Sequence, residues 1–107
     1  MDTKLIIIMT TVNTKEQSDE IIKAVLDKKY VACVQTREIE SHYVWDNELC
    51  HDKEILIWLK TEDRMYGKIE QLLKDIHPYE VPEIISVPIE NVADGYMNWV
   101  KESIVKE

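Results

Sequence analysis

The segment His77-Pro78-Tyr79 and the nearby Glu83 contain groups that could exchange protons or hold an ion. An imidazole titrates close to neutral pH and can donate a hydrogen bond to a carboxylate, and Glu83 is six residues farther along. A histidine at the end of a helix can also satisfy the terminal carbonyls and interact favourably with the helix dipole. The sequence therefore leaves two roles open for His77, in a ligand site or in the structure of the chain.

Glu54 and Lys60 form a second group of interest, six residues apart in one predicted strand. Side chains alternate across a strand, so both project from the same face if the strand is regular. Opposite charges on a buried face must be paired or solvated. They could form a structural ion pair between subunits, or the two ends of a pocket that binds an anion and a cation.

Cys33 lies in the apolar run Tyr30–Val34, which predicts a small buried hydrophobic side chain. Its thiolate could instead bind a soft metal such as Cu(I) if it faced a crevice. Cys50 is the second cysteine, and two cysteines do not make a disulfide framework. We therefore expect two thiols in a reducing compartment, and hence a cytoplasmic protein.

His42 and His51 flank a predicted hairpin turn at Asp46-Asn47, two residues that tolerate positive φ. A two-residue turn would place the two histidines directly opposite each other on neighbouring strands. Two imidazoles at this separation could reach one Cu(II), Zn(II) or Ni(II) ion. A structural zinc site normally has four ligands, so two solvent-exposed histidines without a metal are the alternative interpretation.

The composition excludes several classes of function. A chain of 107 residues and 12.6 kDa predicts one domain over residues 1–107. Thirteen basic and 21 acidic residues give a net charge of −8, which disfavours nucleic-acid binding. The apolar run Leu5–Met9 is too short to span a membrane. Two glycines leave little for a phosphate-binding loop, and the sequence offers no nucleophile with its base, so we expect no enzyme and assign no catalytic residue.

The first half of the chain predicts a strand, a helix and a long strand. Lys4–Thr10 is a β-branched apolar run, and Thr14 and Gln17 have the spacing of a helix-starting capping box. We expect one long strand through Tyr30–Val34 and Ile39–Trp45, bent or bulged at residues 36–38. The intervening helix has an apolar face formed by Ile21, Ile22, Val25 and Leu26.

The second half predicts a strand, a helix, a strand and a short C-terminal helix. The strands are Ile55–Leu59 and Ile84–Val87. Residues 61–63 are expected to cap the helix between them, and His77-Pro78 to end it. The apolar stripe of the helix between the two strands is formed by Ile69, Leu72, Leu73 and Ile76. The C-terminal helix is marked by Tyr96, Trp99, Val100 and Ile104.

This order predicts an α+β, ferredoxin-like split βαβ (βαββαβ) sandwich with an antiparallel sheet and a C-terminal helix. Right-handed crossovers put both long helices on one face of the sheet and leave the other face bare. The aromatic side chains exceed what so small a layered domain easily buries, so we expect oligomerisation through the bare face. These side chains are Tyr43, Trp45, Trp58 and Trp99.

With these elements placed, the sequence resembles the CutA family of divalent-cation tolerance proteins from Ile6 to Ser103. The most specific motif is the string His77–Ile85, HPYEVPEII. The other matches are shorter: Thr10-Thr11, Ala32-Cys33-Val34, Tyr43 with Trp45, Asp52-Lys53-Glu54, Leu59-Lys60-Thr61 and Tyr96-Met97-Asn98-Trp99.

The resemblance implies a PII-like homotrimer with a ligand crevice between subunits. In the family, the HPYEVPE loop lines this crevice, and the implied residues here are Cys33, Glu54, Lys60, His77, Tyr79, Glu83 and Trp99. The implied function is binding of a divalent cation, Cu(II) or a similar ion, or of a small ligand, in the response to metal ions. The alternative is a PII-like signalling trimer that binds a small ligand and a protein partner without metal.

The copper ligands described for the family are only partly present. They are a cysteine after the first strand and paired histidines before the proline. This chain has Thr10 at the first position and Ile76 followed by His77 at the others, so His77 is the retained member of the set. Cys33 is the remaining thiol candidate near the implied crevice.

Overall fold

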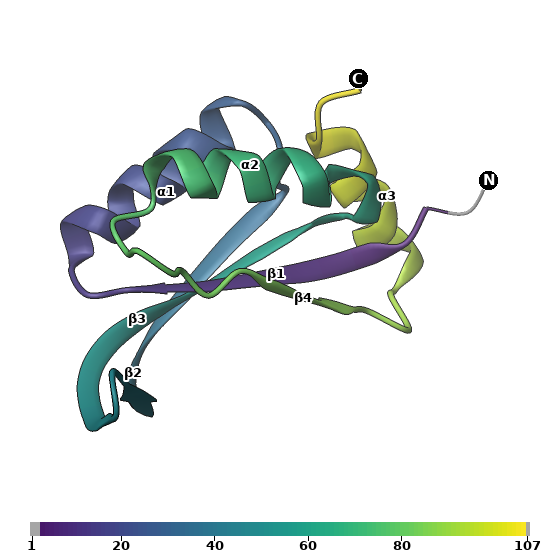
Figure 1. Ribbon diagram of the computed structural model, residues 1–107. Helices are drawn as coiled ribbons and strands as arrows, with labels where there is room; N and C mark the ends of the chain where they lie inside the picture. The colour runs from purple at the N-terminus through teal and green to yellow at the C-terminus, as the bar shows by residue number, and fades with distance from the viewer. Residues whose placement is uncertain (1–2, 107) are drawn as a thin grey trace.

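The computed structural model describes residues 3–106 and contains a four-stranded antiparallel sheet with helices on one side (Figure 1). The strands are β1 (Leu5–Val12), β2 (Cys33–Trp45), β3 (Glu48–Glu62) and β4 (Ile85–Pro88), in the order β2-β3-β1-β4. The helices are α1 (Lys15–Asp27), α2 (Tyr66–Ile76) and α3 (Asp94–Ser103), with a short 3-10 turn η1 (Asp63–Met65) before α2. The predicted α+β, ferredoxin-like order is confirmed.

Strand alternation places one set of apolar side chains beneath α1 and α2. In the described part of the chain, fourteen buried hydrophobic residues form one core cluster. Ile8 and Leu59 are register partners on β1 and β3, and both are fully buried. Ile21 of α1 and Leu73 of α2 close this layer from above, as the 3.6-residue period requires.

The α1 start follows the predicted capping box. The Gln17 amide donates to Thr14 Oγ1 at 3.1 Å, and the Thr14 amide donates to Gln17 Oε1 at 3.2 Å. Two of the otherwise orphaned amides at the helix start are thereby satisfied. The α2 start differs from the expectation for residues 61–63. Thr61 and Glu62 end β3, the Thr61 hydroxyl donates to the Tyr30 carbonyl, and α2 has no side-chain cap.

The β2–β3 hairpin is longer and more regular than predicted. Asp46 and Asn47 form the turn with φ values of 54° and 66°, which confirms the expected two-residue connection. β3 extends over Glu48–Glu62, well beyond the predicted Ile55–Leu59. β2 begins only at Cys33, because a left-handed Lys29 (φ 57°) turns the chain after α1.

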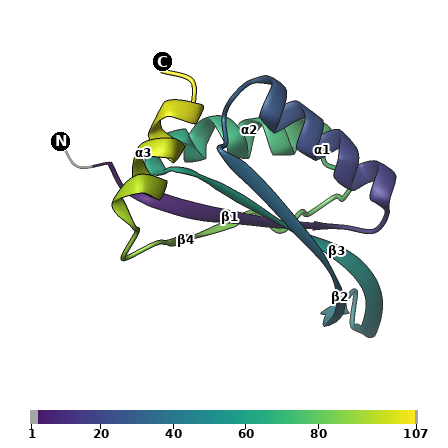
Figure 2. The ribbon, with the colours of Figure 1, turned by 180° about the vertical axis from the view of Figure 1, so that it is seen from behind.

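One long strand bent or bulged at residues 36–38 was predicted; the bulge is wrong, because every residue of Cys33–Trp45 has a register partner in Glu48–Lys60. The paired ribbon instead curves along its length and projects beyond the helices (Figures 1 and 2). This projection leaves both faces of the outer hairpin without a helix above them.

Within residues 3–106, no long helix lies over the second face of the sheet. Ile85 and Val87 of β4 are 49% and 38% exposed, and their register partners on β1 are Met9 and Ile7. Trp58 of β3 pairs with Met9 on the same face. The bare apolar face predicted from the crossover geometry is therefore present in the single chain. α3 packs at the end of the sheet where β1 starts and β3 ends (Figures 1 and 2).

Candidate functional site

His77 anchors the loop that follows α2. Its backbone amide donates to the Leu73 carbonyl at 2.8 Å, and its extended conformation ends the helix. The imidazole Nδ1 accepts a hydrogen bond from the Tyr79 amide at 3.1 Å. Nε2 therefore carries the proton in the neutral ring, and it donates to the Thr11 carbonyl at 3.0 Å. Nε2 also lies 3.0 Å from Thr10 Oγ1.

These contacts give His77 a structural role at the junction of α2 and β1. Desolvation by burial lowers the pKa of the imidazole, against the opposing effects of the Thr11 carbonyl and the Glu54 charge. Both ring nitrogens are engaged, so a metal ion at His77 would have to replace one of these hydrogen bonds.

Tyr79 connects the loop to the central strand β3. Its hydroxyl donates to Glu54 Oε2 at 2.6 Å, and its ring meets the His77 ring edge-on at 4.8 Å between centroids. Glu54 is only 8% exposed, so its carboxylate depends on this donor more than a surface carboxylate would. Burial and the Glu54 hydrogen bond raise the pKa of Tyr79, which keeps the side chain a neutral phenol.

A cavity of about 440 Å³ opens beside the Tyr79–Glu54 pair. Four carboxylate side chains line it, from Asp52, Glu54, Glu80 and Glu83. Partial burial and the charge of Glu54 raise the pKa of Glu83. The remaining lining residues are Thr11, Asn13, Tyr43, Trp45, Tyr79 and Val81. We call this cavity the carboxylate pocket.

Tyr43 and Asp52 belong to the pocket, although no site role was predicted for either. The Tyr43 hydroxyl donates to Asp52 Oδ2, and this hydrogen bond raises the pKa of Tyr43 to about 12. Strand alternation was the available signal, because Asp52 lies two residues before Glu54 and therefore on the same face. Glu80, by contrast, lies in the α2–β4 loop, whose path no local pattern indicates.

The other predicted crevice residues gather at the opposite end of the sheet. Cys33 and Lys60 are register partners, and the Lys60 ammonium lies 5.7 Å from the centre of the Tyr96 ring. Tyr96 in turn contacts Trp99, with 5.6 Å between ring centroids. Six residues of extended strand separate Lys60 from Glu54, a span of about 20 Å. Within one chain, the implied crevice is thus two separate groups.

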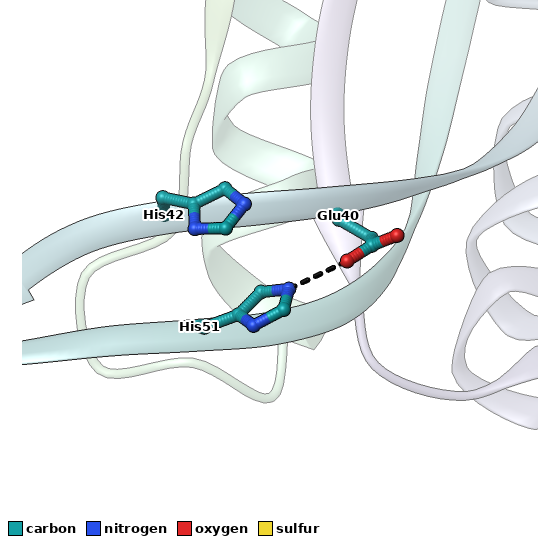
Figure 3. Close-up of side chains that lie close together, drawn as sticks. All are labelled: Glu40, His42 and His51. Atoms are coloured by element: carbon teal, nitrogen blue, oxygen red, sulfur yellow. Dashed lines mark hydrogen bonds and ion pairs between the residues drawn. The ribbon is translucent and has the colours of Figure 1, made fainter.

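The hairpin histidines lie where the predicted register puts them. His42 and His51 are paired residues of β2 and β3, and their rings stack at 4.1 Å with an interplanar angle of 13°. Glu40 joins them, with its Oε1 at 2.6 Å from His51 Nε2 (Figure 3). Glu40 was not singled out in the sequence, although its position two residues before His42 places it on the same face. Cys50 pairs with Tyr43 and faces the opposite side.

Among residues 3–106, no helix has both the length and the apolar character needed to cross a membrane.

The family model described as CutA1 divalent ion tolerance protein matches residues 6–103. The divalent-cation tolerance protein CutA of Thermotoga maritima is 36% identical over 101 residues, which cover 94% of this chain and all of that protein. The crystal structure of CutA1 from Pyrococcus horikoshii aligns with a TM-score of 0.91 at 32% identity, over 94% of this chain and 99% of that chain.

A third similar structure is described as the periplasmic divalent cation tolerance protein CutA from Archaeoglobus fulgidus. It aligns with a TM-score of 0.90 at 27% identity, over 92% of this chain and 97% of that chain. The profile match, the identities and the shared fold extend over nearly the whole sequence. The chain belongs to the CutA1 divalent ion tolerance protein family.

Proposed function

We propose that this protein binds a divalent cation in the carboxylate pocket, as a homotrimer whose subunits complete the pocket for one another. The family relationship supports a role in divalent-cation tolerance. The observation that carries the proposal is that four residues with carboxylate side chains line one cavity. Burial, and to a smaller extent the charge of Glu54, raise the pKa of Glu83, and a bound cation would offset both effects.

The donor atoms favour a cation that accepts oxygen ligands. Carboxylates and tyrosine hydroxyls suit Mg²⁺, Ca²⁺ and Mn²⁺, and Cu(II) and Zn(II) also bind carboxylates. The thiol of Cys33, supplied by a neighbouring subunit, would shift the preference toward copper. The ligand class is thus a divalent cation, with Cu(II) the first ion to test.

Two observations support assembly into an oligomer. The bare sheet face exposes Ile85 and Val87, and burying apolar surface of this kind stabilises association. The two groups of crevice residues are about 20 Å apart along β3 in one chain, so only a second subunit could bring Lys60 near Glu54. We take the number of subunits, three, from the resemblance to the CutA family.

The hydrogen bonds favour binding over catalysis. His77 Nδ1 already accepts the Tyr79 amide, which removes the lone pair that a general base would use. The Tyr79 phenol donates to Glu54 and has a raised pKa, so it is a weak nucleophile at neutral pH. We assign no catalytic residue. Cys33 and Cys50 are free thiols, and we place the protein in the cytoplasm on that basis.

A second candidate function is PII-like signalling through a protein partner. The observation that favours it is the tip of the hairpin, where Val44 and Leu49 are 64% and 89% exposed and Trp45 is 49% exposed. Apolar groups on a projecting arm are typical of a contact surface. A ligand-dependent change in hydrogen exchange at the hairpin, without metal, would distinguish signalling from cation sequestration.

Native mass spectrometry of the reduced protein tests the proposal. The protein is titrated separately with Cu(II), Zn(II) and Mn(II), alongside Glu54→Gln, Glu83→Gln and the control Glu16→Gln on the exposed side of α1. Glutamine at position 54 still offers an oxygen to Tyr79, so the fold should be retained. The expected result is a trimer that takes up three fewer ions in each of the two pocket variants than in the unmodified chain and in the control.

Two results would contradict the proposal. A monomer at micromolar concentration would overturn the assembly. A trimer whose metal uptake is the same in Glu54→Gln and Glu83→Gln as in the unmodified chain would remove the carboxylate pocket as the binding site.

A further inference from the structure

The outer hairpin carries a group of metal-ligating side chains separate from the carboxylate pocket. Glu40, His42 and His51 offer ligand atoms that all lie within 4.8 Å of one another. Asp52, next to His51, points into the carboxylate pocket, and successive strand side chains face opposite sides. The histidines and the pocket therefore lie on opposite faces of the same two-stranded ribbon.

We infer that Glu40, His42 and His51 form a surface binding site for a divalent transition-metal ion, with Cu(II) the preferred ion. Two imidazole nitrogens and one carboxylate oxygen are ligands that Cu(II), Ni(II) and Zn(II) accept. For a given site of this type the affinity order places Cu(II) above Ni(II) and Zn(II). The remaining coordination positions would be taken by water.

The distances fit a single ion after small side-chain rotations. Metal–nitrogen bonds of about 2.0–2.1 Å put two ligand atoms of one ion about 2.9 Å apart when adjacent and about 4.2 Å apart when opposite. His51 Nε2 and Glu40 Oε1 are 2.6 Å apart, close to the adjacent arrangement. The stacked rings must turn about χ2 for their lone pairs to converge, and χ2 of histidine has a broad, shallow energy profile.

The backbone holds these side chains in place without a metal. The two-residue turn and the uninterrupted register of Cys33–Trp45 with Glu48–Lys60 fix His42 opposite His51. Ligands on paired strands are positioned more accurately than ligands on loops. Little reorganisation is then needed when an ion binds.

The site is open to ions from solvent. The side chains of His51 and Glu40 are 54% and 60% exposed, and Glu40 also borders a wide groove of about 820 Å³. In the described part of the chain the His42 ring stacks on the His51 ring and makes no hydrogen bond, so its nitrogens are available. A histidine–carboxylate pair this exposed contributes little to stability by itself, as is general for surface ion pairs. Its replacement should therefore leave the fold intact.

The register partner of Glu40 is Lys53, which projects from the same face. The ammonium group opposes cation binding at short range, while the overall charge of −8 favours it. The site consequently depends on all three ligands, and loss of any one should be measurable.

The three histidines of the chain provide the test. Cu(II) sulfate is titrated into the full chain and into His42→Gln, His51→Gln, Glu40→Gln and the control His77→Gln, followed by calorimetry and by electron paramagnetic resonance. We expect one strong Cu(II) site per hairpin with nitrogen hyperfine coupling from two imidazoles. Affinity should fall by more than about tenfold in each hairpin variant, since even loss of an outer-shell partner costs about 10–100-fold. It should be unchanged in His77→Gln.

A second readout follows from linkage, because an ion that cross-links β2 and β3 stabilises the folded state. The rise in melting temperature caused by Cu(II) should be smaller in His51→Gln than in the unmodified chain, and in Glu83→Gln a rise from the hairpin site should remain. A Cu(II) affinity in His42→Gln and His51→Gln equal to that of the unmodified chain overturns the inference. Loss of binding in Glu83→Gln with the hairpin variants unaffected would assign the ion to the carboxylate pocket instead.

Discussion

Replacement of Tyr79 by phenylalanine removes one hydroxyl and leaves the Glu54 carboxylate without its donor. Glu54 is 8% exposed, and the lost hydrogen bond is 2.6 Å long. Hydrogen bonds to charged groups contribute about 1.5–3 kcal/mol, so we expect Tyr79→Phe to lower the free energy of unfolding by about 2 kcal/mol. With a urea m-value of about 2 kcal/mol/M for a chain of this size, the unfolding midpoint should fall by about 1 M.

Tyr66→Phe is the matched control in the same measurement. The Tyr66 hydroxyl is 3.4 Å from Glu70 Oε2 and 3.5 Å from the Ile84 carbonyl, and both contacts are long. We expect this variant to lose about 0.5 kcal/mol or less. Urea unfolding is followed by far-UV circular dichroism at pH 7, with the protomer concentration held constant because an oligomer is stabilised by mass action.

A double-mutant cycle separates the pair from general packing effects. With Glu54→Gln in place, the Tyr79 hydroxyl donates to a neutral amide, and its removal should cost about 1 kcal/mol less than in the unmodified chain. Equal losses in Tyr79→Phe and Tyr66→Phe, or a coupling energy of zero, would refute the reasoning and show that water replaces the tyrosine hydroxyl.

Two further predictions concern the pH dependence of stability. The pKa of His77 is lower in the folded state than its usual value of 6.5. Below pH 6.5 the unfolded chain therefore binds more protons than the folded chain, and the free energy of unfolding falls as the pH decreases through the folded pKa. Urea unfolding at several pH values should show a smaller stability difference between the unmodified chain and His77→Asn at pH 5.5 than at pH 7.5; a constant difference would contradict this. The Glu83 pKa is raised, so the folded state disfavours the ionised carboxylate and loses stability as the pH rises through the folded pKa. Glu83→Gln should therefore be more stable than the unmodified chain at pH 7, with the gain vanishing below pH 4.5, and a less stable variant at pH 7 would reject the assignment.

The features that the sequence predicted correctly depend on short-range geometry. The capping box at Thr14 and Gln17 involves residues three apart, and the turn at Asp46-Asn47 depends on two residues that accept positive φ. Once this turn is known, counting along both strands gives the pairing of His42 with His51. The bulge was mispredicted because the polar residues at 36–38 resemble an interruption, although they lie on an edge strand where polar side chains face solvent.

Sequence alone determined the element order, the hairpin register and the face that each strand residue occupies, because these follow from local propensity and from the two-residue period of a strand. The tertiary structure decided which residues meet across long separations. Tyr79 reaches Glu54 across 25 positions, and His77 reaches Thr10 across 67. These contacts depend on the path of the α2–β4 loop, which is set by the packing of α2 on the sheet and leaves no periodic signal in the loop itself. The resemblance to the CutA family implied the individual crevice residues, and the fold places them in two groups, at the carboxylate pocket at one end of the sheet and around Cys33 and Lys60 at the other.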